Sequence, residues 1–430
     1  MIEGPVHVGL VSTRLAGTDG VSLEAEKWSR TLNALGLECF FFAGECDRPA
    51  DRSVVIPEAH FTHPEILDLT TALFSGPSRS PETSRKVEQF KTHLKAKLQD
   101  FLLRFHIDLL VVENALSLPV NIPLGLALTE TIAETAVPTI GHHHDFYWER
   151  QRFTISAAGD YLRTAFPPNL PSVRHVVINS FAARQLALRT GASATLVPNV
   201  MDFESPPPPP DGGGDDLRRA LGISDGDWVL LQPTRVIPRK RIELALELAR
   251  RLDEPCSLVI SHAAGDEGSA YMSYLRSFAD LIGVTAIFAT DLIGPERMDL
   301  ADGRRRFSLA DAYAMAQLVT YPSTVEGFGN AFLETIYFSR PIVMSTYDIF
   351  RADIQPKGFR VIGFEDFVNS DTVLQARQVI EDRALAAEMA AHNYELGRRF
   401  YSFSTLERRL AGLVQDILGA EPGAGFFLSL

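Results

Sequence analysis

Short apolar runs alternate along most of the chain with longer segments in which apolar residues recur every three or four positions. The apolar run at residues 6–12 leads into a helical pattern at 21–35, and another apolar run follows at 38–43. Strands that alternate with helices in this way form βαβ units around a parallel sheet. The same alternation resumes at residues 228–235 and continues through the second half. The pattern therefore predicts an α/β fold built from two doubly wound, Rossmann-like domains.

Composition marks the boundary between the two halves. Residues 206–216 read PPPPPDGGGDD, a segment that is stiff at its start, flexible at its end and exposed. A chain of 430 residues is also too long for one ordinary hydrophobic core. We therefore expect an N-terminal domain over residues 1–204, a linker over 205–216 and a C-terminal domain over 217–399, with a final helix within 400–430.

One stretch of the second half, residues 321–343, has the pattern of a ligand site. A short strand ending at Ser323 is followed by a glycine-containing turn and then by an amphipathic helix. Glycines let the backbone approach a ligand closely, and the start of the helix directs N–H groups and the positive end of its dipole toward an anion. Glu326 and Glu334 lie on either side, where they can reach hydroxyl groups of the same ligand. The predicted anion-binding residues are Gly327, Phe328, Gly329 and Asn330. A nucleotide sugar fits this description, and the alternative is a solvated surface helix after a core strand.

The loop after the first predicted strand is a second candidate, because ligands of parallel sheets bind at the carboxyl ends of the strands. It contains Gly17 and Gly20 and leads directly into a helix. Such a loop suits a phosphate or a sugar bound by backbone N–H groups. An ordinary turn between a strand and a helix explains these residues equally well.

A run of three histidines, His142, His143 and His144, follows a predicted strand near residue 140. Neighbouring side chains of an extended segment point to alternate sides, so all three imidazoles cannot bind one metal ion. A single histidine at the end of a strand is better placed to touch a substrate. In the loop beyond, Trp148 could cover a sugar face and Arg150 could bind an anionic group of an acceptor. A packed loop is the alternative for these two residues.

The helical pattern at residues 84–105 has an apolar face and a face rich in lysine and arginine. A basic amphipathic helix can bind a membrane or an anionic acceptor. A helix that faces the core and keeps its charged side in solvent is the more common case, and we expect it here.

Charge and cysteine content narrow the class of protein. The formal net charge of -13 disfavours nucleic acid and anionic membranes as partners. Three cysteines, Cys39, Cys46 and Cys256, lack the spacing of metal ligands and fit a reducing cytoplasm. We expect no signal peptide, because a strand pattern begins at Val6 without a basic segment before it. We also expect no membrane-spanning helix, because the sequence has no apolar run long enough to span a bilayer. A cytoplasmic protein is therefore expected.

Several segments, taken in order, resemble the retaining glycosyltransferases of family 4. The most specific resemblance is the pair Glu326 and Glu334, separated by seven residues around a G-F-G turn. Residues 234–241, TRVIPRKR, resemble the family segment G-R-x-x-x-x-K-G, and residues 197–202, VPNVMD, resemble its P-N-G-x-D segment. Here Val200 replaces the glycine of the second segment.

The resemblance implies a GT-B fold, with the active site in a cleft between two Rossmann-like domains and a C-terminal helix that crosses back to the first domain. It implies that Arg235 and Lys240, together with N–H groups of the turn, hold the donor diphosphate. It further implies that Glu334 binds the ribose and that Glu326 and a histidine bind the transferred hexose. His144 matches the family histidine best, and His143 is the alternative.

Three segments, GTDGVSLEAEKW, HDFYWER and YPSTVEGFGNAFLE, are most similar to the mannosylglucosylglycerate synthases. That resemblance implies transfer of mannose from GDP-mannose to glucosylglycerate, a small anionic acceptor, to make a compatible solute. It implies no required cofactor and at most a stimulatory divalent metal. The alternatives are a disaccharide synthase that uses UDP-glucose or ADP-glucose, a lipid or polysaccharide mannosyltransferase, and a nucleotide-sugar-binding protein without catalysis.

Overall fold

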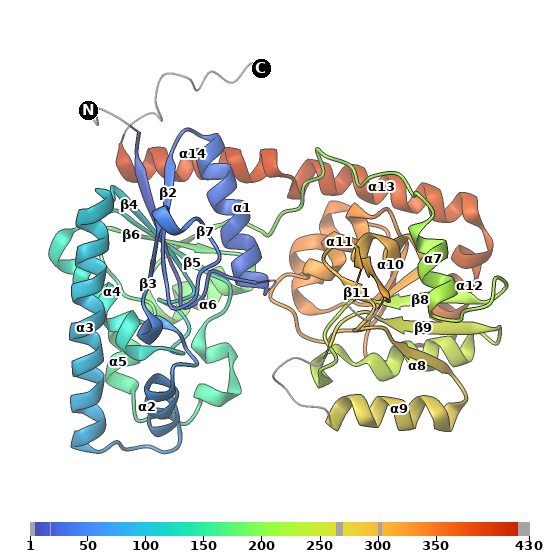
Figure 1. Cartoon of the computed structure of the whole chain (residues 1–430), viewed down its shortest axis with the longest axis horizontal. Helices are drawn as coiled ribbons and strands as arrows, with labels where there is room; N and C mark the ends of the chain where they lie inside the picture. The colour runs from blue at the N-terminus through green and yellow to red at the C-terminus, as the bar shows by residue number, and fades with distance from the viewer. Residues whose placement is uncertain (1–4, 18, 264–269, 300–302, 420–430) are drawn as a thin grey trace. The chain divides into compact units, whose positions relative to one another are not determined.

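The computed structural model describes residues 5–17, 19–263, 270–299 and 303–419 (Figure 1). The chain divides into two compact units. Unit 1 is Met1–Val200 together with Phe403–Leu430, and unit 2 is Met201–Ser402. From the sequence, we expected the first domain to end at residue 204 and the chain to return to it at residue 400. Each unit contains one parallel sheet with helices on its faces, as the alternating pattern predicted.

Unit 1 is built on a seven-stranded sheet in the order β3-β2-β1-β4-β5-β6-β7, in which all neighbouring strands are parallel. The strand order reverses between β1 and β4: β2 and β3 follow on one side, and β5, β6 and β7 follow on the other. In open α/β sheets, ligands bind at such a point, in the loops at the carboxyl ends of the strands. The strands are β1 (His7–Val11), β2 (Glu38–Ala43), β3 (Ser53–Val55), β4 (Leu109–Glu113), β5 (Thr139–His143), β6 (Val173–Val177) and β7 (Ala194–Leu196).

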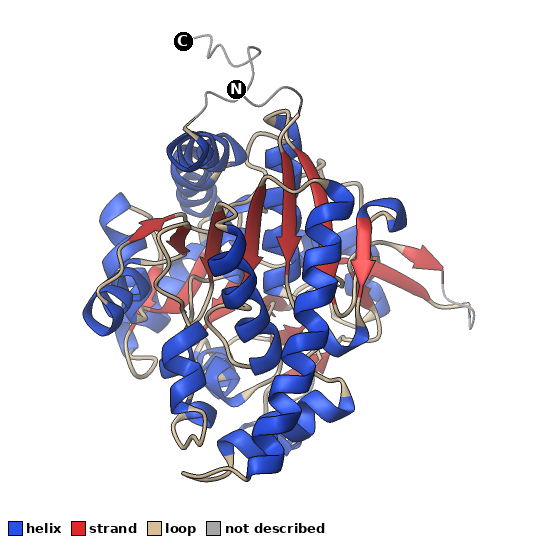
Figure 2. Ribbon diagram, turned by 90° about the vertical axis from the view of Figure 1, so that its left-hand side faces the viewer, coloured by secondary structure: helices blue, strands red, loops and turns tan. Residues whose placement is uncertain are grey.

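Two hydrophobic layers cover the faces of this sheet, and Figure 2 shows helices packed in front of and beside the strands. One layer includes Trp28 of α1 and Leu410 of α14, packed on residues such as Leu10 of β1. The other includes Leu98 of α3 and Leu128 of α4. The helices are α1 (Gly20–Ala34), α2 (Pro64–Phe74), α3 (Pro81–Phe105), α4 (Ile122–Thr135), α5 (Gly159–Ala165), α6 (Ser180–Thr190) and α14 (Phe403–Leu418). The C-terminal helix thus belongs to the core of unit 1.

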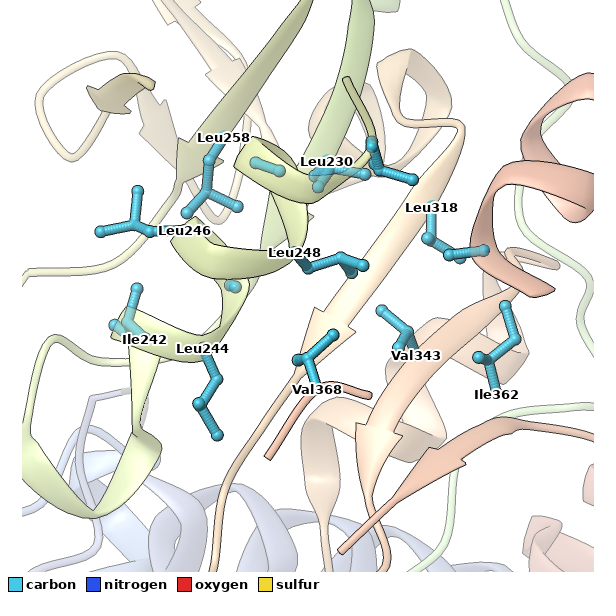
Figure 3. Packing of buried hydrophobic residues seen from close by; sticks show 14 of the residues in the cluster. Leu230, Ile242, Leu244, Leu246, Leu248, Leu258, Leu318, Val343, Ile362 and Val368 are labelled. Carbon is cyan, nitrogen blue, oxygen red and sulfur yellow. The ribbon is translucent and has the colours of Figure 1, made fainter. Parts of the chain in front are cut away.

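Unit 2 has a six-stranded parallel sheet in the order β10-β9-β8-β14-β15-β16. Figure 3 shows leucines of α8 packed against β8, β9 and β14 in its main core. The strands are β8 (Trp228–Gln232), β9 (Cys256–Ile260), β10 (Thr285–Phe288), β14 (Leu318–Tyr321), β15 (Ile342–Ser345) and β16 (Ile362–Phe364). The helices are α7 (Gly213–Ala220), α8 (Ile242–Arg251), α9 (Ala270–Ile282), α10 (Leu309–Met315), α11 (Asn330–Tyr337), α12 (Ser370–Glu381) and α13 (Arg383–Tyr401). A small extra sheet joins β11 (Ile293–Gly294), β12 (Met298–Asp299) and β13 (Arg305–Ser308).

The end of the predicted linker is helical. Residues 213–216 form the first turn of α7, and Gly213 and Gly214 are buried there. A Cβ at Gly213 would lie 2.1 Å from the guanidinium of Arg297. Arg297 also binds Asp211, with Nη1 2.5 Å from Oδ2. Composition suggested a flexible Gly-Asp segment, but small residues are needed there so that the arginine can pack against the helix.

The basic helix α3 faces the core as expected, with Val87, Leu94 and Phe101 buried. Two of its lysines, Lys91 and Lys95, form ion pairs. Lys95 Nζ lies 2.8 Å from Glu130 Oε1 and 2.6 Å from Glu134 Oε1, both on α4. Among the described helices, none combines the length and apolar character needed to cross a bilayer.

Candidate functional site

A buried tyrosine, Tyr347, packs against the turn between β14 and α11 and forms a hydrogen bond with its backbone. The hydroxyl of Tyr347 donates a hydrogen bond to the carbonyl of Phe328 at 2.7 Å. The next residue, Gly329, adopts φ +122, and a Cβ there would lie 2.2 Å from the Tyr347 hydroxyl. Gly329 also precedes α11 and provides no side-chain cap for it. N–H groups at the start of a helix can bind an anion.

This turn gives the first prediction. Gly329→Ala is expected to lower the free energy of unfolding by about 1–3 kcal/mol, because the methyl group would clash with Tyr347 and the positive φ disfavours alanine. It is also expected to weaken binding of nucleoside diphosphates. Urea unfolding and nucleotide-dependent thermal shifts measure the two effects. Gly412→Ala, in open space on α14, is the matched control. Parallel behaviour of the two variants would contradict this role for the turn.

Glu326, the first residue of the turn motif, is held by two cations of the loop after β8. Lys240 Nζ forms a short ion pair with Glu326 Oε1. Arg239 Nη1 lies 3.2 Å from Glu326 Oε2 and 3.1 Å from the carbonyl oxygen of Val325. The side chains of Lys240 and Glu326 are 9% and 10% exposed. Because β8 and β14 are adjacent in the sheet, their carboxyl ends bring these loops together.

Burial and ion pairing have opposite effects on the pKa values of Glu326 and Lys240. Burial alone would raise the pKa of Glu326, but the charges of Lys240 and Arg239 outweigh it and hold that pKa below its usual value. Burial lowers the pKa of Lys240, and the neighbouring Arg239 and Arg235 lower it further, against the raising effect of Glu326. A cation held in low-dielectric surroundings interacts strongly with a developing negative charge.

The other predicted donor residues of unit 2 lie around the same edge of the sheet. Arg235 is exposed and close enough to lower the pKa of Lys240 and of His262 by its charge. Glu334 lies on α11, where the hydroxyl of the buried Tyr313 donates to its Oε2 at 3.4 Å. Unit 2 thus carries cations, a helix N-terminus and two carboxylates on the loops and the helix that follow β8 and β14. Their roles toward a donor stay a prediction.

One departure from the family pattern has a visible consequence. Arg241, which stands where the family commonly has glycine, adopts φ 47 and ψ 46 directly before α8. That left-handed region costs an L-residue about 1 kcal/mol. The chain therefore keeps a glycine-like backbone at this position without the glycine.

In unit 1 the histidine run forms two separate clusters, one on each side of β5. His143 turns toward β6, where its Nε2 lies 2.9 Å from Nδ1 of His175. His142 and His144 turn toward β4. There His142 Nδ1 lies 2.9 Å, and His144 Nε2 3.0 Å, from the same oxygen, Oε2 of Glu113. The alternation predicted from the extended backbone is therefore observed.

Backbone contacts fix the position of His144. Asn114, in the left-handed region with φ 57, accepts hydrogen bonds on its side-chain oxygen from the N–H of His144 at 2.7 Å and that of Asp145 at 3.4 Å. Asparagine tolerates this conformation better than most residues. The end of β4 therefore determines how the chain leaves β5.

Glu113, His142 and His144 each offer one potential ligand atom, and these three atoms lie within 4.8 Å of one another, a set that could also be considered for a divalent ion. Both imidazole nitrogens approach one carboxylate oxygen at hydrogen-bond distances. Burial would raise the pKa of Glu113, but the two histidines lower it to about 2. Burial lowers the pKa of His142, whereas for His144 the hydrogen bond and charge of Glu113 outweigh burial and raise it. An ionised carboxylate beside an imidazolium at His144 fits this geometry.

The first loop of unit 1 uses its amides internally. The N–H of Gly17 donates to Asp47 Oδ2 at 2.8 Å. Gly20 begins α1, and Asp19 caps that helix by accepting from the N–H groups of Val21 and Ser22. Thr18 lies outside the described residues. The carboxylate of Asp19 thus occupies the start of α1, where the sequence predicted that a phosphate could bind. Donor binding by Gly17 and Gly20 stays a prediction.

The two predicted acceptor residues are both engaged with neighbours. The ring of Trp148 stacks on Phe146 at 4.5 Å, and the guanidinium of Arg189 lies 5.2 Å from it. Arg150 Nη2 lies 2.6 Å from Asp145 Oδ2. An acceptor role for Trp148 and Arg150 stays a prediction, and an anionic acceptor would compete with Asp145 for the guanidinium.

The structure adds residues that the sequence did not single out: Glu113, Asn114, Arg239, Tyr313 and Tyr347. Glu113 had a signal, because a carboxylate at the end of the apolar run IDLLVV lies at the ligand edge of a parallel sheet. The two tyrosines had none, since only the tertiary fold brings them to Glu334 and to the turn.

Solved structures establish the class of fold. A glycosyltransferase from Rickettsia africae aligns with 97% of this chain and 99% of its own, with a TM-score of 0.67 and 10% identity. WaaG, a glycosyltransferase involved in lipopolysaccharide biosynthesis, aligns with 96% and 100%, with a TM-score of 0.60 and 16% identity. HepE from Anabaena, solved with UDP-glucose, aligns with 95% of this chain and 99% of its own, with a TM-score of 0.63 and 13% identity. The fold is that of the GT-B glycosyltransferases.

Two curated proteins define the family more closely. Mannosylglucosylglycerate synthase of Thermotoga maritima is 31% identical, and the alignment covers 94% of this chain and 98% of that protein. The enzyme of the same name from Petrotoga mobilis is 30% identical, with 87% and 92% covered. No family model matches the chain. The protein is a glycosyltransferase, and it belongs to the mannosylglucosylglycerate synthase family, which confirms the resemblance found in the sequence.

Proposed function

We propose that this protein transfers mannose from GDP-mannose to glucosylglycerate with retention of the anomeric configuration. The observation that carries the proposal is the pair of relatives named mannosylglucosylglycerate synthase, each at about 30% identity over nearly their whole length. The acceptor would be small and anionic, and the product would be a compatible solute. The reaction would take place in the cytoplasm.

The donor would be held mainly by unit 2. Arg235, Lys240 and the N–H groups at the start of α11 would bind the diphosphate, and Glu334 would bind the ribose. This assignment is supported by the buried ion pair of Lys240 and by the uncapped helix start at Gly329. Fixed cations can stabilise the departing diphosphate without a metal, so a divalent ion would be at most stimulatory.

Transfer would take place on one face of the sugar. The bond between the mannose C1 and the phosphate oxygen breaks, and the acceptor oxygen bonds to C1 on the same face. The departing phosphate takes the proton of the acceptor hydroxyl, and GDP leaves. Glu326 would bind hydroxyls of the hexose. His144 would hold the hexose in its oxocarbenium-like state through hydrogen bonds rather than act as a base.

The acceptor would be recognised by its carboxylate and its glucose ring. Arg150 is the proposed partner of the carboxylate, and Trp148 the proposed contact for the sugar. Arg150→Ala is expected to raise the KM for glucosylglycerate about tenfold while leaving the KM for the donor unchanged, because a charge-assisted hydrogen bond contributes about 1.5 kcal/mol. Initial rates at varied acceptor concentration measure this. An unchanged acceptor KM would remove Arg150 from the site.

A donor panel tests the proposal as a whole. Thermal shifts with GDP-mannose, UDP-glucose and ADP-glucose identify the nucleotide, and product analysis with glucosylglycerate then identifies the reaction. We expect the largest shift with GDP-mannose, followed by formation of mannosylglucosylglycerate. A larger shift with UDP-glucose or ADP-glucose would indicate a different synthase. Stabilisation by a nucleotide without transfer or donor hydrolysis would indicate a binding protein.

A further inference from the structure

Glu113 is a buried carboxylate at the end of β4 that the proposed mechanism does not yet use. It has no exposed surface. Among the described residues, its Oε1 has no hydrogen-bond partner, and the groups within reach of Oε2 that carry or can carry positive charge are His142 and His144. A buried carboxylate requires a compensating cation, so one of these histidines must supply it.

The two histidines differ in a way that selects His144. His142 is 1% exposed, and its ring is stacked on Trp28 with centroids 4.1 Å apart. The Nδ1 of His142 lies near Glu113, but its approach lacks hydrogen-bond geometry. His144 makes a full hydrogen bond from Nε2 to Glu113 and is 7% exposed. Of the two histidines, His144 is therefore the more exposed.

Resting on the proposed function, we propose that Glu113 is a positioning residue that holds the His144 ring by Nε2 and keeps it a cationic hydrogen-bond donor whose Nδ1–H faces the transferred sugar. Glu113 touches no substrate and acts only through His144. A carboxylate behind an imidazole fixes both the orientation of the ring and the site of its protons.

Other charges around His144 act in the same direction or are neutralised. Glu24 of α1 is buried and also raises the pKa of His144, but its charge is shared with Lys27, which forms an ion pair with it. Asp145 follows His144 directly and pairs with Arg150. His142, on β5, opposes a charge on His144 only if it is itself protonated, and burial lowers its pKa. Glu113 is thus the acidic group bonded directly to the ring.

The test uses Glu113→Gln in the full-length protein, which preserves size and removes the charge. The pKa of His144 is expected to fall by about one to two units. Because the proposed donor is the imidazolium, the alkaline limb of the kcat profile moves to lower pH by the same amount. At alkaline pH, kcat falls about 10- to 100-fold, and the KM for the donor changes little. Glu113→Asp, which keeps the charge, is expected to return the alkaline limb of the kcat profile part of the way toward its wild-type pH.

Glu149→Gln is the matched control. Glu149 accepts a hydrogen bond from the N–H of Phe146 at 2.9 Å in the same loop, and it is not among the acidic groups that raise the pKa of His144. The same chemical change there is expected to leave the pH profile in place. An identical alkaline shift in both variants, or none in Glu113→Gln, would overturn the proposal.

A second measurement does not depend on activity or on a variant that folds. The ring nitrogens of His144 are followed by NMR in protein labelled with 15N-histidine, with the signal assigned by its loss in His144→Gln. We expect a pKa above the ordinary value of about 6.5. Titration at or below that value would overturn the proposal. So would a stoichiometric divalent ion that is present in the purified protein and lost in Glu113→Gln.

These results separate the two levels of inference. A wild-type protein without transfer activity but with an elevated His144 pKa contradicts the proposed function alone. An active wild-type protein with an ordinary His144 pKa contradicts the positioning role alone.

Discussion

Lys240→Met is expected to lower kcat/KM for the nucleotide sugar by about 100- to 1000-fold. Loss of one preorganised group that stabilises developing charge has an effect of this size. Lys240 is held almost entirely out of solvent against Glu326, and methionine keeps its length while removing its charge. Initial rates at varied donor concentration measure the loss, and added divalent ion tests whether another cation can replace the lysine.

Stability must be measured beside activity, because the substitution breaks a buried ion pair. Such a break commonly costs about 3–5 kcal/mol. Glu326 keeps its contact with Arg239, so we expect a smaller cost than that here. Arg250→Met is the matched control: the side chain of Arg250 is 59% exposed on α8, and its Nη1 lies 3.9 Å from Asp253 Oδ1. A folded Lys240→Met protein with normal kcat/KM would contradict diphosphate binding at this site.

His144→Ala is expected to lower kcat about 100-fold or more while the protein still binds the nucleoside diphosphate. The proposed role of His144 is to hold the hexose by hydrogen bonding in the oxocarbenium-like transition state, and the loss of such a positioned hydrogen bond lies in this range. Single-turnover rates with saturating donor separate the chemical step from binding. Thermal shifts with GDP measure whether the diphosphate site is intact.

His143→Gln tests the choice between the two adjacent histidines. His143 is buried on the opposite side of β5 beside His175, and burial lowers its pKa well below the ordinary value. We expect this variant to lose some stability and to keep its turnover per folded molecule. Near-normal turnover in His144→Ala, with a loss in His143→Gln, would reverse the assignment and remove the basis for the role of Glu113.

The fold could be predicted because its signals are local. Apolar runs and helical periodicity set the order of elements, and the capped ends of helices lie close to where the pattern placed them. The start of α7 was missed, because composition alone does not reveal that Gly213 makes room for Arg297. The short edge strand β3 was also missed, since three residues carry little periodicity.

The candidate site could be predicted only where its residues lie in one segment. Glu326, Gly329 and Glu334 share a turn and a helix, so the sequence displays them together. The partners that hold them come from distant segments: Tyr347 under the turn, and Tyr313 beside Glu334. The pairing of Glu113 with His144 spans 31 residues and depends on the adjacency of β4 and β5. No local pattern encodes such pairings, because the register of a parallel sheet is set by the fold as a whole.

The most direct test of the central claim is an NMR analysis of the product formed from GDP-mannose and glucosylglycerate by the purified protein. The account predicts release of GDP together with a product in which mannose is joined to glucosylglycerate through an α linkage, the configuration of the donor. A β-linked product would contradict retention. Release of free mannose alone, or binding of GDP-mannose with no product, would contradict the proposed transfer itself.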